Sequence, residues 1–295
     1  MAEYRHSQWK GKTGGTPWMQ RALIPLARVT PLAVLYGIMA LVVPFYMLFN
    51  HKGYLATWHF FRRRMGYGPV KAFISVYRNH FVFGQVILDR FAMYAGKSFE
   101  FVLPEKDDFG AMTSGEEGLL IAGSHVGNYE LAGYSLDSRD KAFHALVFGG
   151  ETETVMNGRN RMLGRNHISL IPISDDMSHI FAVNNALADG GIVSMHCDRV
   201  FGSGKSVECD FFGSKAVFPA GGFNIACMRS LPMLAVFVMK DGLRRYRVFE
   251  VPVECSGSSR KDMVASMAQN FASALEGVVR QYPLQWFNYY EFWND

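Results

Sequence analysis

Residues 119–130 read LLIAGSHVGNYE, and the expected architecture follows from them. The apolar run at the start predicts a buried strand that ends at Gly123. Open α/β sheets carry their ligand sites at the carboxyl ends of strands, so His125 is expected at such an edge. A helix is expected to begin after Gly127, which places Glu130 in its first turn. A histidine oriented by a nearby carboxylate can act as a general base, although a His-x4-Glu spacing is also typical of an ordinary polar pair near a loop.

The composition of the 295-residue chain indicates one large α/β domain with an appended segment, because 49% of its residues are hydrophobic and 14% are aromatic. The formal net charge of +4 suits an anionic membrane surface or an anionic substrate. It is too small to indicate nucleic acid as a partner, and no nucleic-acid-binding motif is present. The cysteines lack CxxC and zinc-finger spacing, so we interpret them as reduced, cytosol-facing thiols and predict no metal site. They are Cys197, Cys209, Cys227 and Cys255.

The N-terminal region carries the signals of membrane association. Residues 30–49, TPLAVLYGIMALVVPFYMLF, contain no charge over a length that can cross a bilayer as a helix. We expect a membrane anchor here, either spanning the bilayer or lying at its interface, and the alternative is a buried helical hairpin bent at a proline. Residues 54–64 combine aromatics with three arginines, as elements that dock on phospholipid headgroups do. Residues 69–96 predict a long amphipathic helix that covers one face of a sheet.

The remainder of the chain alternates between short apolar strands and helical stretches, which predicts a layered α/β sheet flanked by helices. The expected strands are 99–103, 119–122, 143–147, 168–171, 192–195, 234–239 and 246–253. The expected helices are near 127–136, 151–165, 176–188, 219–229 and 260–281. The predicted organisation is therefore a membrane anchor over 1–53, interfacial and amphipathic helices over 54–96, and an α/β domain over 97–295.

Three clusters beyond residue 150 are candidates for binding or catalysis. Residues 157–165 contain three arginines, which suit a phosphate clamp or, equally, a solvated helix face. The three are Arg159, Arg161 and Arg165. Asp198 and Arg199 follow an expected strand, at the end where functional groups concentrate. Residues 210–222, DFFGSKAVFPAGG, form an apolar turn that could line a tunnel for an aliphatic chain or pack as ordinary core.

These elements occur in an order that resembles the bacterial late acyltransferases of lipid A biosynthesis, the lauroyl/myristoyl transferase family. The match covers most of the chain and begins with the hydrophobic anchor. The blocks that carry it, in chain order, are Ser124-His125 to Glu130 with its His-x4-Glu/Asp pair, the arginine block at 158–161, the aspartate block at 191–199, the Phe-Phe-Gly block at 211–221 and the Pro-x-Gln-Trp sequence at 283–286.

The resemblance implies a glycerolipid-acyltransferase-like fold and acyl transfer from a thioester to a lipid hydroxyl or amine, with acyl carrier protein as the expected donor carrier and coenzyme A as the alternative. His125 is then expected to be the general base, and Glu130 is expected to orient its imidazole. Asp198 is expected to position the acceptor or to anchor Arg199. No acyl-enzyme, metal or bound cofactor is needed, and His196 is expected to have a structural or surface role.

The same resemblance assigns the substrate-binding residues. Arg159 or Arg161 would bind a phosphate of the donor or of the acceptor. Backbone N–H groups near Gly127 and Asn128 would stabilise the oxyanion. An aromatic wall would hold the acyl chain, and it consists of Phe211, Phe212 and Phe218.

The resemblance also implies a bacterial inner-membrane location with the catalytic domain facing the cytoplasm. Two departures leave the acceptor open among a lipid A precursor, a lysophospholipid, an aminolipid and a pigment-type lipid. Asp198 is followed by Arg where lipid A enzymes usually have Gln or His, and residues 286–293 lack their usual Arg-rich ending. One competing class is a hydrolase with Ser124 or Cys197 as nucleophile, although no Gly-x-Ser-x-Gly elbow is present. Another is a non-catalytic, lipid-binding accessory protein.

Overall fold

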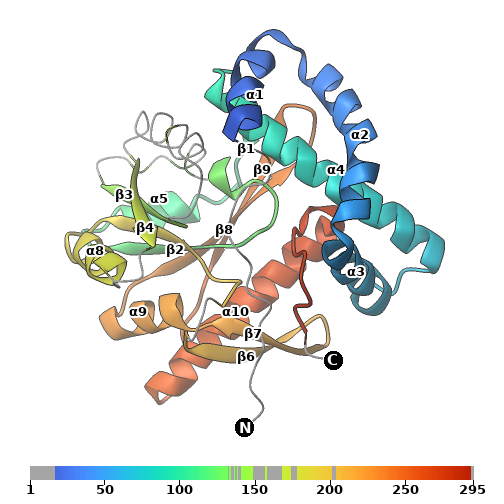
Figure 1. Cartoon of the computed structure of the whole chain (residues 1–295). Coiled ribbons are helices and arrows are strands. Elements are labelled where there is room, and N and C mark those ends of the chain that lie inside the picture. The colour runs from blue at the N-terminus through green and yellow to red at the C-terminus, as the bar shows by residue number, and fades with distance from the viewer. Residues whose placement is uncertain are drawn as a thin grey trace.

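A central seven-stranded sheet organises the computed structural model, which describes residues 17–131, 133, 136, 138, 141–148, 157, 168–173, 178–200 and 204–293. The strands lie in the order β1-β9-β8-β2-β5-β3-β4 (Figure 1). Their bounds are β1 Glu100–Val102, β2 Leu119–Gly123, β3 Phe143–Phe148, β4 Ile168–Ile173, β5 Ile192–His196, β8 Met233–Lys240 and β9 Arg245–Pro252. Five neighbouring strands from β8 to β4 are parallel, and β9 pairs antiparallel with β8. The layered α/β sheet flanked by helices that the sequence predicts is therefore confirmed, and the structure shows it to be mostly parallel.

The two faces of the sheet are both buried, as expected for a parallel sheet covered by helices. Every residue of β2 is buried, and alternate residues point to opposite faces. Leu120 and Ala122 join the larger core cluster, which packs under α8, α9 and α10, while Leu119 and Ile121 join a second cluster with Phe109. The continuous apolar run at 119–122 reflects this double burial.

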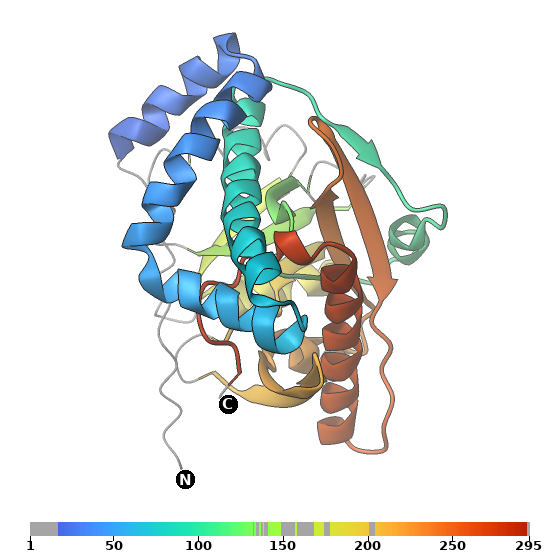
Figure 2. The same ribbon diagram turned by 90° about the vertical axis from the view of Figure 1, so that its right-hand side faces the viewer.

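The helices surround the sheet (Figures 1 and 2). In chain order they are α1 Pro17–Val29, α2 Leu32–Phe49, α3 His51–His59, the π-helix η1 Phe60–Arg64, α4 Pro69–Tyr94, α5 Asp108–Thr113, the 3-10 helix η2 Tyr129–Leu131, α8 Ser178–Ala188, α9 Gly221–Arg229, α10 Arg260–Gln281 and the 3-10 helix η3 Pro283–Gln285. Residues 260–281 form a helix as predicted, and a capping box between Ser259 and Asp262 fixes its start. The helix expected near 151–165 lies outside the described residues, apart from Asn157.

A separate two-stranded hairpin, β6 (Ser206–Phe211) and β7 (Ser214–Pro219), was not predicted. Its two-residue turn places both Phe212 and Gly213 at positive φ, 50° and 74°. That conformation suits a tight hairpin turn, but phenylalanine is not a residue type that signals one. The segment at 210–222 therefore contains most of a hairpin rather than a simple turn into a helix.

Helix α2 lies against α4, on the side of α4 away from the sheet (Figures 1 and 2). Among the described residues it is long and apolar enough to cross a membrane, with a mean hydropathy of 2.3, and 22% of its residues are buried. The predicted apolar helix is thus present, from Leu32 to Phe49. Its sequence and length alone do not distinguish a spanning anchor from an interfacial one.

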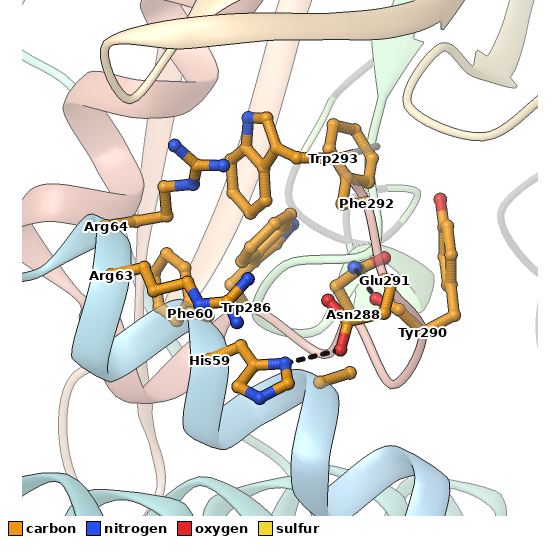
Figure 3. A pocket seen from close by; sticks show the side chains of 11 residues that line it. His59, Phe60, Arg63, Arg64, Trp286, Asn288, Tyr290, Glu291, Phe292 and Trp293 are labelled. Atoms are coloured by element: carbon orange, nitrogen blue, oxygen red, sulfur yellow. Dashed lines mark hydrogen bonds and ion pairs between the residues drawn. The ribbon is translucent and has the colours of Figure 1, made fainter. Parts of the chain in front are cut away.

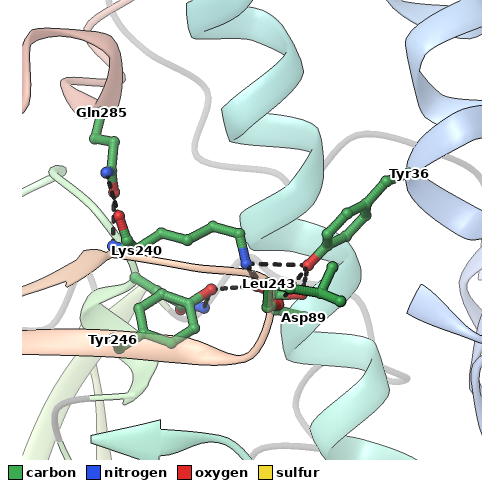
Figure 4. A network of polar contacts seen from close by, with 7 residues as sticks. Tyr36, Asp89, Lys240, Leu243, Tyr246 and Gln285 are labelled. Atoms are coloured by element: carbon green, nitrogen blue, oxygen red, sulfur yellow. Dashed lines mark hydrogen bonds and ion pairs between the residues drawn. The ribbon is translucent and has the colours of Figure 1, made fainter. Parts of the chain in front are cut away.

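A buried charged network ties α2 and α4 to the sheet (Figure 4). Asp89 of α4 is fully buried and accepts hydrogen bonds from the hydroxyls of Tyr36 and Tyr246. The Nζ of Lys240, at the end of β8, lies 2.7 Å from the Asp89 carboxylate. Burial raises the pKa of Asp89, and the same three partners oppose that shift. Satisfying every oxygen of a buried carboxylate in this way allows it to remain charged.

Candidate active site

The carboxyl ends of two neighbouring parallel strands bring the candidate catalytic residues together. In the register of β2 and β5, Gly123 lies opposite His196. The N–H of Cys197 donates to the carbonyl of Gly123 at 2.9 Å, which holds the two strand ends in step. Two residues further along each chain segment, His125 and Asp198 meet. This is the edge at which α/β sheets place their active sites.

Two hydrogen bonds join His125 to Asp198. The Nδ1 of His125 lies 2.9 Å from Oδ1 of Asp198, and the backbone N–H of His125 donates to Oδ2 at 2.7 Å. Both residues are buried, at 8% and 2% exposure. One carboxylate thus fixes both the position of the histidine backbone and the rotation of its ring.

The protonation states follow from burial and from Arg199. Burial alone would raise the pKa of Asp198, but His125 and Arg199 outweigh it and hold that pKa well below its usual range. Burial and the charge of Arg199 lower the pKa of His125, against the opposing effect of Asp198. The imidazole is therefore neutral at pH 7. Its Nδ1 carries the proton that Asp198 accepts, and Nε2 keeps a lone pair that can take a proton.

His196 also lies at this site, and the structural or surface role expected for it remains a prediction. Its ring stacks on His125 with centroids 4.5 Å apart, and the ring of Tyr129 meets it edge-on at 4.4 Å. One ligand atom from each of His125, His196 and Asp198 lies within 4.8 Å of the others, a spacing that would suit a metal ion. The direct contact from Nδ1 of His125 to the carboxylate accounts for the same closeness without one.

Glu130 lies in η2, and its described partners come from α4. Arg90 contacts one carboxylate oxygen at 2.5 Å, and the Tyr94 hydroxyl donates to the other at 3.0 Å. The carboxylate bonded to Nδ1 of His125 is that of Asp198. The orienting role assigned to Glu130 from the sequence remains a prediction, and the geometry offers Asp198 for that role.

The loop after His125 is held by contacts that the sequence did not reveal. Gly127 adopts a left-handed conformation, with φ of 52°. Its N–H donates to the carbonyl of Gln285 at 2.9 Å, and the N–H of Asn128 donates to that of Val238 at 2.7 Å. These two N–H groups are therefore engaged in this conformation, and the oxyanion hole expected from N–H groups near Gly127 and Asn128 remains a prediction. The side-chain amide of Asn128 donates to the Tyr246 hydroxyl at 3.3 Å, so it supports the loop.

The Pro-x-Gln-Trp sequence lies next to this loop. Gln285 is buried, and its side-chain amide exchanges two hydrogen bonds of 2.8 Å with the backbone of Lys240. The N–H of Phe287 donates to the His125 carbonyl at 3.1 Å, and Trp286 pairs with Val126 in an isolated bridge. The chain near its C-terminal end thus braces the loop that contains His125.

The segment that follows Trp286 also packs on the π-helix η1 (Figure 3). The rings of Phe60 and Trp286 are 4.8 Å apart, and His59 contacts Glu291 at 2.7 Å. The guanidinium of Arg64 lies 4.4 Å from the centroid of Trp293. Residues 54–64, which the sequence predicts to be interfacial, therefore contact the segment that braces the loop containing His125.

Arg199 is part of the protein interior near the site. It is 8% exposed, and it donates to the Phe287 carbonyl at 2.8 Å. Its guanidinium lies 5.6 Å from the ring centroid of Tyr290. These contacts hold the positively charged guanidinium close to Asp198. This favours an electrostatic role for Arg199, and its contact with substrate remains a prediction.

The three phenylalanines assigned to the acyl-chain wall lie in the main core cluster. They are at most 5% exposed and pack on one another and on aromatic residues of α10 and the C-terminal segment. The residues are Phe211, Phe212 and Phe218. Their arrangement supports the core-packing interpretation that the sequence left open.

A mainly apolar cavity of about 80 Å³ lies beside His196 instead. Tyr129 and Glu130 form part of its polar wall. Its apolar lining comes from the strands and includes Ile121, Phe143, Ala145, Leu146, Val147, Ile168, Met195 and Val236. An aliphatic chain in this cavity would lie next to the His125–His196 pair. The sequence gave no signal for it, because the lining residues are scattered over five strands.

The remaining predicted residues fall into two groups. Arg159, Arg161 and Arg165 lie outside the described residues. Ser124 and Cys197 are each 1% exposed, and burial raises the pKa of the Cys197 thiol. A buried thiol that resists ionisation is a poor nucleophile, which disfavours Cys197 as the nucleophile of a hydrolase. All four cysteines are free in this structure.

Comparison with known proteins agrees with this geometry. A profile of the family described as bacterial lipid A biosynthesis acyltransferase matches residues 85–294. That range includes the His125–Asp198 pair, the cavity and the bracing segment near the C-terminal end. No curated protein matches the chain significantly.

Proposed function

The chain belongs to the bacterial lipid A biosynthesis acyltransferase family, and on this premise we propose that it transfers a fatty acyl chain from a thioester to a hydroxyl or amine of a membrane lipid. The observation that carries the proposal is the double contact between His125 and Asp198 at 2.9 and 2.7 Å. A neutral imidazole with its Nδ1 proton held by a carboxylate is arranged to accept a proton at Nε2.

The proposed reaction is a direct transfer. Nε2 of His125 removes the proton of the acceptor hydroxyl or amine while the acceptor attacks the thioester carbonyl. The C–S bond then breaks, and the imidazolium returns the proton to the departing thiolate. Asp198 stabilises the imidazolium between these steps, as the carboxylate of a catalytic triad does. A thioester is already activated, so no acyl-enzyme is required.

We assign the orienting role to Asp198 and a different role to Glu130. Arg90 and Tyr94 hold Glu130 at the wall of the cavity, where it can contact the acceptor. The cavity itself is apolar enough to receive part of the acyl chain. Arg159, Arg161 and Arg165 remain proposed phosphate ligands, on the strength of their spacing alone.

The donor, location and acceptor rest on the family. Acyl carrier protein is the proposed donor carrier, with coenzyme A as the alternative, and no bound cofactor or metal is invoked. The proposed location is the bacterial inner membrane with the catalytic domain on the cytoplasmic side. The acceptor is proposed only as a lipid with a free hydroxyl or amine.

Lipid mass spectrometry tests the proposal. Host cells that lack the gene are complemented with the wild type or with His125→Ala. One lipid class should lack a single acyl chain in the deletion strain, and only the wild type should restore it. Full restoration by His125→Ala would refute the mechanism.

An assay on the purified protein separates transfer from hydrolysis. Acyl carrier protein and coenzyme A thioesters are supplied with and without the lipid identified in cells. Transfer requires the acceptor, whereas a hydrolase releases fatty acid in water alone. A non-catalytic accessory protein would give neither product.

A further inference from the structure

The outer surface of the N-terminal helices is unusually apolar. Fourteen of the eighteen exposed large hydrophobic side chains in the described part of the chain lie between Trp18 and Ile74. On α2 all of them except Tyr46 form one stripe, with spacings of three and four, that faces away from α4. Its members are Val34, Ile38, Leu41, Val42, Phe45, Leu48 and Phe49. We call this stripe, together with the exposed apolar residues of α1 and of the first turns of α4, the docking face.

The opposite side of α2 is attached to α4 along most of its length. Near one end, the hydroxyl of Tyr36 donates to the buried Asp89. In the middle, the hydroxyl of Tyr77 donates to the carbonyl of Ala40 at 3.1 Å. Near the other end, the ring of Tyr46 lies 6.0 Å from that of His80. Tyr36 thus contacts the C-terminal part of α4 at Asp89, whereas Ala40 and Tyr46 contact its N-terminal part at Tyr77 and His80, so the two helices lie antiparallel.

This attachment constrains how α2 can meet a bilayer. If α2 crossed the membrane in this arrangement, α4 would be carried to the same depth. Arg78, Asn79, His80 and Asp89 of α4 would then lie at the level of the hydrocarbon core. Lys240 of β8, which pairs with Asp89, and Leu284 of η3, which accepts from Asn79, would lie there too. Ionisable groups are costly at that depth.

The positive charge of the N-terminal region indicates what kind of partner the docking face binds. Between residues 17 and 88 the chain has eight basic residues and no Asp or Glu. They are Arg21, Arg28, Lys52, Arg62, Arg63, Arg64, Lys71 and Arg78. A second copy of the chain would present the same positive charge, so self-association is opposed. In an anionic leaflet, the lipid headgroups complement this charge and the acyl chains beneath them complement the apolar stripe.

We propose that the docking face lies in the plane of one leaflet of an anionic bilayer, with α2 parallel to the surface rather than across it. This inference refines the membrane association in the proposed function. It makes no use of the catalytic residues, so either statement can fail alone. The buried Tyr36–Asp89–Tyr246 contacts then fix the sheet relative to the lipid surface.

Depth measurements on the full chain distinguish the two orientations. Three variants each carry one new cysteine, in place of Val34, Leu41 or Leu48, in a Cys227→Ser, Cys255→Ser background. The new cysteine of each variant is labelled with an environment-sensitive fluorophore. Quenching by spin-labelled lipids is then measured in vesicles that contain phosphatidylglycerol. The three positions are seven residues apart, so a spanning helix would separate neighbours by about 10 Å in depth. The in-plane arrangement predicts one shared, shallow depth.

Two controls accompany the depth measurement. A label at Phe181, an exposed side chain on α8, should remain unquenched. His125→Ala should give the same depths as the wild-type background, which separates docking from catalysis. A stepwise depth profile, or a stable dimer in the absence of vesicles that buries the face, would overturn the proposal.

Charge reversal tests the lipid chemistry. The double variant Lys52→Glu, Lys71→Glu should bind phosphatidylglycerol vesicles at least about tenfold more weakly than the wild type. The matched control is Arg260→Glu, Lys261→Glu, on the exposed first turn of α10, which should bind as the wild type does. Equal binding of the wild type to phosphatidylcholine and to phosphatidylglycerol vesicles would refute the anionic preference.

Discussion

The replacement of Asp198 by asparagine tests the mechanism most directly. Asparagine has nearly the same shape, and its Oδ1 can still accept the backbone N–H of His125, which now lies 2.7 Å from the carboxylate. Its NH₂ group would then face Nδ1 of His125. Two donors cannot share that contact, so the ring must switch to the tautomer with its proton on Nε2. That tautomer has no lone pair at the position required of the base.

The expected size of the effect follows from this tautomer switch. The same substitution in a Ser-His-Asp triad lowers kcat about 10⁴-fold with the geometry intact. Because the Asp198 carboxylate is buried and also stabilises the imidazolium, we expect a loss of about 10³- to 10⁴-fold, or about 4–5.5 kcal/mol of transition-state stabilisation. KM should change little, since His125 and Asp198 act on the proton.

The assay is single-turnover acyl transfer from acyl carrier protein, with Glu130→Gln as the matched comparison. Glu130→Gln keeps the size of a side chain that Arg90 and Tyr94 hold, so we expect a loss of no more than about tenfold. A larger loss in Glu130→Gln than in Asp198→Asn would refute the reasoning. Thermal unfolding of both variants checks that the comparison is made on folded protein.

Three further predictions concern stability and pH. Asp89→Ala leaves the Lys240 cation buried without its carboxylate and should lower the free energy of unfolding by about 3–5 kcal/mol in urea titrations. Gly127→Ala adds a Cβ 2.1 Å from a backbone carbonyl at positive φ and should cost about 3 kcal/mol, whereas Gly221→Ala, with open space around it, should be nearly neutral in the same titration. Because burial lowers the pKa of His125, kcat/KM should be level from pH 7 to 8 and fall only below about pH 6.5, and an acid limb above pH 7 would contradict a buried neutral base.

The strands were predictable because hydrophobic patterning acts locally. The continuous run of β2 reflects burial on both faces, and the start of α10 reflects the capping box at Ser259. The β6–β7 hairpin was missed because Phe212 occupies a left-handed turn position that normally signals Gly, Asn or Asp. Local signals fail where tertiary packing, here a buried aromatic cluster, selects the residue.

His125 and Asp198 were also predictable as members of the site, but their pairing was not. His125 and Asp198 each follow an apolar strand, so both could be placed at the sheet edge from the sequence. Glu130, five residues from His125, was the nearer carboxylate in sequence. The partner found in space is 73 residues away, because the β2–β5 register sets Gly123 opposite His196. Register between strands distant in sequence cannot be read from one chain.

The hydrogen bonds of Gly127 and Asn128 were likewise not readable from the sequence, and they bear on how the site is built. A glycine followed by a short helix often offers free N–H groups, yet here Gly127 and Asn128 donate to carbonyls of η3 and β8. Asn128 also reaches Tyr246, which donates to Asp89, and Asp89 binds Tyr36 of α2. The loop next to His125 is thus connected through buried hydrogen bonds to the helix that we place on the membrane. If His125 is presented to a lipid as we propose, this arrangement is favourable, because the proposed docking face and the loop that contains the proposed base are parts of one hydrogen-bonded network.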